Sequence, residues 1–119
     1  MRPLVIKVLA GASDPERCWQ GFTVATMAIA AGAQVSMWLA SDAVWLAVPG
    51  QAERLTLPQA PPLVDLVDAV RSGATLTACT QCLTRRDIAP ADLLPGVRVA
   101  GAATFVAEVL QPDTQALTY

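Results

Sequence analysis

The stretch VIKVLAGASDPE, residues 5–16, gives the clearest indication of the fold. Residues 5–10 form a short apolar run rich in β-branched side chains, which is typical of a strand buried on both faces of a sheet. Ser13 or Asp14 can then cap a helix with Pro15 in its first turn. The passage from strand to helix within a few residues predicts the first strand–helix unit of an α/β protein.

The same alternation continues to the end of the chain. The further predicted strands are residues 34–40, 74–78, 97–100 and 115–118, with a short extended piece at 53–57. The predicted helices and helical turns are residues 15–31, 43–48, 61–73, 80–86, 89–96 and 103–110. Strands that alternate with helices indicate a mostly parallel sheet with helices on both faces. A length of 119 residues predicts a single domain, residues 1–119.

The composition limits the partners that the protein can attract. Charged residues make up 15% of the chain, below the usual share of about 25%, so we expect part of the surface to be buried in a homo-oligomer. The net charge of −2 favours neither nucleic acid nor an acidic membrane surface. The chain has no histidine, which excludes imidazole metal ligands and any Ser-His or Cys-His pair.

The location of the protein is predicted from its cysteines and its N-terminal residues. Three cysteines, an odd number, favour free thiols in a reducing compartment. The first seven residues contain two charges and no signal-peptide pattern. The segment 18–41 carries no formal charge, but the break at residues 31–33 divides it into a buried helix and a buried strand. We therefore expect a cytoplasmic protein without a membrane span.

The segment TACTQCLTRRD, residues 77–87, contains the candidate chemistry. Cys79 follows an apolar strand and begins a helical turn, and ligands of open α/β sheets bind beyond the carboxyl ends of the strands. A helix N-terminus favours thiolate over thiol. Arg85 and Arg86 follow within two turns and can stabilise the thiolate or hold an anionic group. Sulfur transfer and thiol redox chemistry both need such a thiolate.

Cys82 forms a Cys-x-x-Cys pair with Cys79, for which two interpretations remain. The pair can close a disulfide, or Cys82 can resolve a modified Cys79. Alternatively, both are small buried residues. A zinc site needs four ligands, and one pair plus Cys18 does not supply them within one chain. We therefore predict neither a metal nor another cofactor.

Three other residues have weaker signals. Cys18 lies on an apolar helix face and is interpreted as a core cysteine. Gly11 follows the first strand, where a loop can hold an anionic ligand, but a lone glycine favours a plain strand-to-helix connection. Asp42 follows the second strand and is either a polar group of the site or the cap of the next helix.

The spacing around Cys79 resembles the DsrE/DsrF-like family, which includes the TusD-type subunits of sulfur relay. In TusD-type proteins a strand-end cysteine is followed by two arginines, at the positions of Arg85 and Arg86, and then by a glycine, where this chain has Asp87. The resemblance implies a three-layer α/β/α sandwich around a mostly parallel sheet of about five strands. It also implies a homotrimer or homohexamer, and a cysteine that accepts sulfur as a persulfide from a donor protein and passes it to an acceptor.

Three hypotheses about function follow. In the first, the protein is a sulfur carrier, with or without sulfurtransferase activity, that uses Cys79. In the second, it reduces disulfides or peroxides with Cys79 and Cys82 as attacking and resolving thiols. In the third, it is a non-catalytic oligomeric binding protein in which both cysteines are structural. We favour the first, and fold resemblance alone does not establish it.

Overall fold

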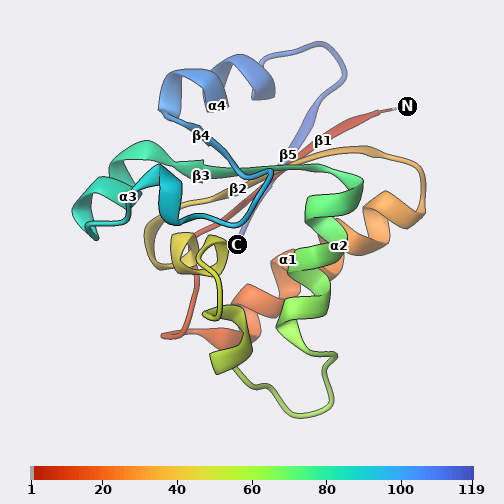
Figure 1. The fold of residues 1–119 in the computed structure, drawn as a ribbon. Coiled ribbons are helices and arrows are strands. Elements are labelled where there is room, and N and C mark those ends of the chain that lie inside the picture. The colour runs from red at the N-terminus through yellow and green to blue at the C-terminus, as the bar shows by residue number, and fades with distance from the viewer. Residues whose placement is uncertain (1) are drawn as a thin grey trace.

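The computed structural model describes residues 2–119, which fold into a parallel sheet between layers of helices (Figure 1). The strands are β1 (Pro3–Val8), β2 (Gln34–Leu39), β3 (Thr75–Cys79), β4 (Arg98–Ala100) and β5 (Gln115–Thr118). The α-helices are α1 (Pro15–Ala30), α2 (Leu63–Gly73), α3 (Thr80–Arg85) and α4 (Ala102–Val109). Shorter 3₁₀ helices are η1 (Ser41–Ala47), η2 (Ala52–Arg54) and η3 (Pro90–Asp92).

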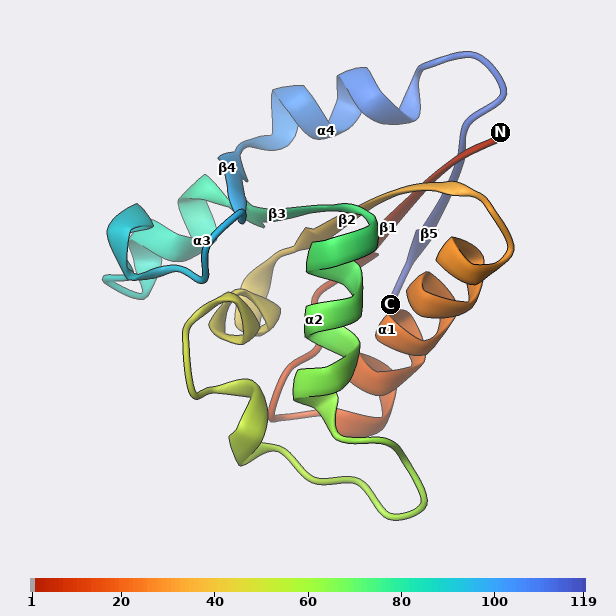
Figure 2. The same ribbon diagram turned by 45° about the vertical axis from the view of Figure 1, so that its right-hand side comes forward.

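The sheet has the strand order β4-β3-β2-β1-β5, and all its pairings are parallel. Helices α1 and α2 cover one face, α4 crosses the other, and α3 lies at the end of β3 (Figure 2). This arrangement confirms the predicted three-layer α/β/α sandwich with five strands. The carboxyl ends of all five strands therefore point toward the same edge of the sheet.

The start and end of α1 follow from local signals in the sequence. The Asp14 carboxylate accepts a hydrogen bond from the backbone N–H of Arg17 at 3.3 Å, and Pro15 occupies the first turn. After α1, Gly32 adopts a φ of +90°, a left-handed conformation that glycine tolerates best. The predicted cap and stop of this helix are confirmed.

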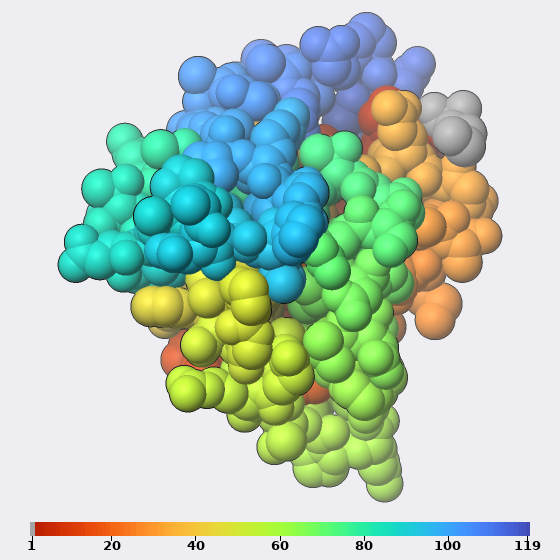
Figure 3. Space-filling view, in the orientation of Figure 1, coloured from red at the N-terminus to blue at the C-terminus, as the bar shows by residue number. Residues whose placement is uncertain are grey.

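The hydrophobic core lies between the sheet and helices α1 and α2. Alternate residues of β1, Ile6 and Val8, point toward these helices and are fully buried. Phe22 of α1 and Leu39 of β2 are buried in the same cluster. In the space-filling view the residues of α4 lie along the top of the molecule (Figure 3), and the ribbon shows this helix on the opposite face of the sheet from α1 and α2 (Figure 2).

Three predicted elements differ from the structure. Residues 53–57 form no strand of the sheet, because Glu53 and Arg54 belong to the 3₁₀ helix η2, and the backbone becomes extended only at Leu55. β1 covers residues 3–8 rather than 5–10, because its pairing with β2 starts at Pro3. The remaining predicted strands and helices occur in the expected order with ends displaced by at most two residues, except that the predicted turn 89–96 is helical only at residues 90–92.

Candidate functional site

Cys79 is both the last residue of β3 and the residue that precedes the first turn of α3. Its backbone is extended, with φ −69° and ψ 124°, so the chain turns from strand to helix directly after the thiol. The side chain is half-buried. The thiol therefore lies at the carboxyl edge of a parallel sheet, where α/β proteins bind their ligands.

Several groups act on the protonation of this thiol. Burial raises the pKa of Cys79, but its polar neighbours more than offset burial and leave the pKa below its ordinary value of 9.0. These neighbours are the backbone N–H and the thiol of Cys82, the backbone N–H of Gln81, and the Lys7 ammonium. Helix α3 begins without a side-chain hydrogen bond to its first N–H groups, so these donors remain available to a thiolate. The arrangement favours a nucleophilic sulfur.

Cys82 lies one turn into α3 and is buried, with 8% of its surface exposed. The two residues are free thiols, and the Cys82 thiol is one of the groups that lower the pKa of Cys79. Cys18 differs from both, because burial followed by the charge of Asp14 raises the pKa of this fully buried thiol to about 12. Cys18 is therefore a core cysteine, as the sequence predicted.

The predicted residues Asp42 and Arg86 form an ion pair at the same edge of the sheet. The Arg86 guanidinium donates to the Asp42 carboxylate at 2.8 Å and to the Cys82 backbone carbonyl at 3.1 Å. Asp42 does not cap η1, because the N-cap position is Ala40 and no side chain bonds the first N–H groups, so the capping role, one of the two predicted for Asp42, is wrong. Arg86 instead ties the end of β2 to the helix that begins at Cys79.

Gly11 is in contact with Asp42 rather than with an open loop. Gly11 is buried, and a Cβ atom built on it would lie 2.8 Å from the Asp42 backbone oxygen. The small size of this residue lets the loop after β1 pack against η1. Gly11, Asp42 and Arg86 are thus brought together with the Cys79 helix, whereas Arg85 is exposed at its end.

Sequence analysis missed Lys7 as a member of this region. Lys7 pairs with Trp38, and Trp38 pairs with Thr77, so Lys7 lies in a row that crosses the sheet beside Cys79. The lysine ammonium lies 4.6 Å from the centroid of the Phe105 ring of α4. Lys7 is a single charged residue within an apolar strand, and this was the only signal in the sequence that could have pointed to it. Which residues lie near Lys7 follows only from the order of the strands in the sheet.

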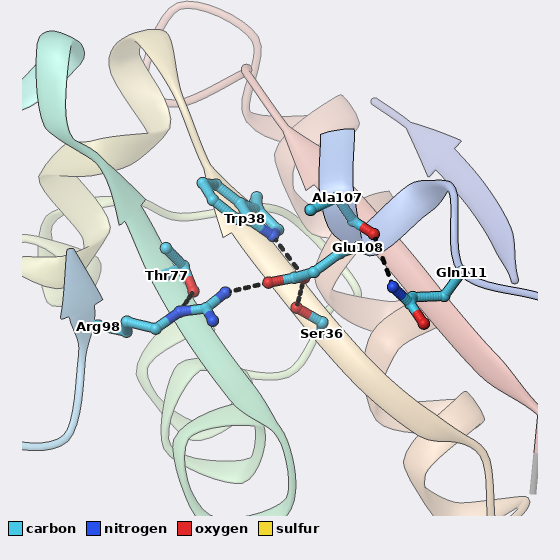
Figure 4. A network of polar contacts seen from close by, with 7 residues as sticks. All are labelled: Ser36, Trp38, Thr77, Arg98, Ala107, Glu108 and Gln111. Carbon is cyan, nitrogen blue, oxygen red and sulfur yellow. Dashed lines mark hydrogen bonds and ion pairs between the residues drawn. The ribbon is translucent and has the colours of Figure 1, made fainter. Parts of the chain in front are cut away.

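A polar network fastens α4 to the sheet next to this row (Figure 4). The Glu108 carboxylate accepts hydrogen bonds from the Ser36 hydroxyl, the Trp38 indole and the Arg98 guanidinium. Arg98 also donates to the Thr77 hydroxyl at 2.8 Å. Burial raises the pKa of Glu108, but these donors offset it and lower the pKa below 4.5. Glu108 of α4 is therefore held as a carboxylate between this helix and the sheet.

An open cavity of about 760 Å³ lies beside the site. Its lining includes Ser13, Asp42, Trp45 and Arg54, but not Cys79.

Among residues 2–119, no cluster of three His, Cys, Asp or Glu side chains is placed to hold a metal ion. None of the helices in this part of the chain has both the length and the apolar character needed to cross a membrane.

The fold and site together define a small α/β protein with a cysteine at the carboxyl edge of its sheet. The model of the DsrE/DsrF-like family matches residues 4–116, and the chain belongs to this family. A relative of Methanocaldococcus jannaschii, the uncharacterized protein MJ0760, is 28% identical over 106 residues. That match covers 88% of this chain but 38% of MJ0760, so the chain spans less than half of that relative.

Solved structures show the same fold. The ychN protein from E. coli superposes with a TM-score of 0.83 at 18% identity, over the whole of both chains. MTH1491 from Methanobacterium thermoautotrophicum, a protein of unknown function, superposes with a TM-score of 0.72 at 13% identity, again over both whole chains. BT1422 from Bacteroides thetaiotaomicron covers 99% of this chain and 95% of its own, with a TM-score of 0.65 at 17% identity.

Proposed function

We propose that this protein is an intracellular sulfur carrier that binds sulfane sulfur as a persulfide on Cys79. The observation that carries the proposal is a half-buried thiol at the carboxyl edge of the sheet, with a pKa lowered by its own helix and by Lys7. Membership of the DsrE/DsrF-like family, whose members are generally related to sulfur relay, agrees with it. A free thiolate of this kind persists in a reducing compartment such as the cytoplasm.

The proposed reaction has two half-steps. The Cys79 thiolate attacks the outer sulfur of a donor persulfide, which forms a bond between the two sulfurs, breaks the donor S–S bond and releases the donor thiolate. An acceptor thiolate then attacks the outer sulfur on Cys79, which regenerates the Cys79 thiolate. No net oxidation or reduction occurs in either step, so the carrier needs no cofactor.

The neighbouring predicted residues have supporting roles in this proposal. Arg86 bonds both Asp42 and the Cys82 carbonyl, and so holds the first turn of α3 in place around the thiol. Gly11 allows the loop after β1 to pack on Asp42. Arg85, exposed at the end of α3, is available to a donor or acceptor protein. We also propose a homotrimer or homohexamer, because the chain is poor in charge and its family often forms oligomers.

The pair of cysteines favours a second candidate function. The Cys82 thiol faces the Cys79 sulfur closely enough to lower its pKa, and residues three apart at a helix start can close a disulfide. In this alternative, Cys79 attacks a disulfide or peroxide and Cys82 resolves the product. The buried position of Cys82 favours the carrier, because a resolving thiol must move to exchange.

Intact mass spectrometry after incubation with a small persulfide donor tests both functions. The reduced wild-type chain should gain about 32 Da, reversibly, and the gain should disappear in Cys79→Ser but remain in Cys82→Ser. Cys18→Ser is the matched control and should load like the wild type. A loss of about 2 Da that either Cys79→Ser or Cys82→Ser abolishes would support the disulfide pair instead. An unchanged mass in every protein would contradict both chemical functions.

A further inference from the structure

Lys7 and Cys79 point to the same face of the sheet, although two strands separate them. Lys7, Trp38 and Thr77 are paired in one row across β1, β2 and β3. Side chains alternate between the faces of a strand, so Cys79, two residues after Thr77, shares the face of that row. From the spacing between strands and the rise per residue, the Cα atoms of Lys7 and Cys79 lie about 12 Å apart. An extended lysine side chain and a cysteine side chain together cover most of that distance.

Lys7 is a cation of this face that forms no ion pair within residues 2–119. Arg98 of β4 pairs with Glu108 of α4, and Arg86 of α3 pairs with Asp42 of η1. Among residues 2–119, the four ion pairs do not include Lys7. A half-buried ammonium without a counter-ion favours an anion beside it.

The first turn of α4 lies next to the cysteine and contacts the Lys7 ammonium. Ala100 of β4 pairs with Cys79, and α4 begins two residues later, so the helix starts beside the thiol. Phe105 presents its ring to Lys7 at 4.6 Å and stands edge-on to Trp38, with 5.4 Å between ring centroids. A cation over an aromatic face is attracted to it. Phe105 therefore restricts where the lysine side chain can lie.

We propose that Lys7 is the cation that stabilises the Cys79 thiolate and the persulfide anion formed on it, and that Phe105 positions Lys7 for this role. The persulfide part of the inference rests on the proposed function, whereas the effect on the thiolate does not. The Lys7 charge acts in the direction that lowers the pKa of Cys79. A cation at this place also favours negatively charged sulfur donors, such as a deprotonated persulfide, over neutral ones.

Paired alkylating reagents test the role of Lys7 without any sulfur donor. Iodoacetate is an anion and iodoacetamide is neutral, so the ratio of their rates at Cys79, located by fragment mass spectrometry, reports the local charge. We expect Lys7→Met to lower this ratio by about threefold or more, and to move the midpoint of the pH–rate profile upward. Lys7→Arg should keep most of the wild-type ratio.

Two further variants separate position from charge. Arg2 is exposed and precedes the other end of β1. Arg2→Met therefore removes the same charge far from Cys79 and should leave the iodoacetate-to-iodoacetamide ratio unchanged. Phe105→Leu keeps Lys7 but removes its aromatic partner, so we expect a ratio between those of wild type and Lys7→Met, with recovery in Phe105→Tyr. Phe105→Leu also provides the test if Lys7→Met does not fold.

The outcomes distinguish this inference from the carrier function. Equal ratios in wild type, Lys7→Met and Phe105→Leu would overturn the role of Lys7, even if Cys79 takes up sulfur normally. A ratio that falls equally in Lys7→Met and Arg2→Met would also overturn it, because the effect would then come from net charge. A lowered ratio confined to Lys7→Met and Phe105→Leu supports the inference, even if no sulfur is bound.

Discussion

At Cys79, burial and polar neighbours act on the thiol in opposite directions. Burial raises its pKa, while the N–H groups of α3, the Cys82 thiol and Lys7 lower it by a larger amount. A lowered pKa gives a larger fraction of thiolate, and the thiolate is the form that attacks sulfur. Cys18, with a pKa raised to about 12 by burial and Asp14, remains a thiol. We therefore expect sulfur to bind to Cys79 and not to Cys18.

Gly11→Ala tests the contact that joins the loop after β1 to the end of β2. The new Cβ would lie 2.8 Å from the Asp42 backbone oxygen, and backbone cannot move aside as a flexible side chain can. We expect the free energy of unfolding, measured by urea denaturation, to fall by about 1 to 3 kcal/mol. Gly101→Ala is the control, because nothing lies within 4 Å of its added Cβ. Equal stability of Gly11→Ala and wild type would contradict the close contact.

Sequence alone predicts some residues of the site and misses others for a definite reason. Cys79 is found because its apolar strand and the helix after it are neighbours in sequence. The Asp42–Arg86 pair and the position of Lys7 depend on which strands lie side by side. Periodicity shows that strands exist, but it does not give their order in the sheet. The sequence therefore left two roles open for Asp42, a site group or a local cap, because its partner Arg86 is 44 residues away.

At the scale of elements, α4 is attached to the sheet by polar contacts more than by a core. None of its residues is fully buried, and Glu108 joins it to Ser36, Trp38 and Arg98. The edge-to-face contact of Phe105 and Trp38 adds an apolar part. Because α4 also positions Lys7, loss of this attachment should affect both stability and the reactivity of Cys79.

Glu108→Gln tests the contribution of the carboxylate. The donors around Glu108 overcome the effect of burial and lower its folded-state pKa below 4.5, so its stabilisation is present above that value and is lost as the pH falls through the folded pKa. At neutral pH we expect the variant to be less stable than wild type by about 1 to 3 kcal/mol. Denaturation at several pH values should show the difference shrinking in acid.

The control for this prediction is Glu53→Gln, which removes an exposed carboxylate of η2. It should change the free energy of unfolding by less than about 0.5 kcal/mol. A Glu108→Gln deficit that stayed constant down to strongly acidic pH would contradict the account, since protonated Glu108 could not supply the charge that the variant lacks.

Elements were predictable where the sequence contains both a start and a stop signal. Helix α1 has Asp14 before it, Pro15 in its first turn and Gly32 after it, and its predicted ends are nearly correct. Residues 53–57 were expected to be a short extended piece. Residues 53 and 54 instead continue the 3₁₀ helix that starts at the buried Ala52, and within residues 2–119 the sheet contains no strand from this segment.

For the molecule as a whole, the two faces of the sheet are covered unequally. Helices α1 and α2 enclose a large apolar core, whereas α4 alone crosses the other face. Val106 and Leu110, in α4 and just after it, are 48% and 76% exposed. Exposed apolar side chains on a chain with 15% charged residues fit a surface that another subunit covers.

Analytical ultracentrifugation tests the proposed oligomer. We expect a mass three or six times that of the 12.5 kDa chain, and a shift toward the single-chain mass in the double variant Val106→Asp, Leu110→Asp. Met27→Asp places the same charge on an exposed apolar residue of α1 and is the control. A single-chain mass for the wild type would refute the oligomer. Dissociation by Met27→Asp alone would move the interface to α1.

The overall architecture was more predictable than the assembly of the site. Alternation of strands and helices requires a parallel sheet, because a helix between two strands brings the chain back to the same end. The resemblance of the Cys79 segment to the DsrE/DsrF-like family implied the three-layer α/β/α sandwich. The family match over residues 4–116 agrees with this resemblance. The position of Lys7 on the same face of the sheet as Cys79, and its contact with Phe105, required the structure.

The central claim is that Cys79 both holds sulfur and gives it up. The most direct measurement is a chase experiment. The protein is loaded with radioactive sulfur from a persulfide donor, desalted, and then mixed with an acceptor thiol. The wild type should retain about one sulfur atom per chain and lose it to an added acceptor thiol, whose own persulfide gains the label, while Cys79→Ser should retain none. Two results would contradict a carrier based on this cysteine. In the first, Cys79→Ser retains as much label as the wild type; in the second, the acceptor thiol does not remove the label from the wild type.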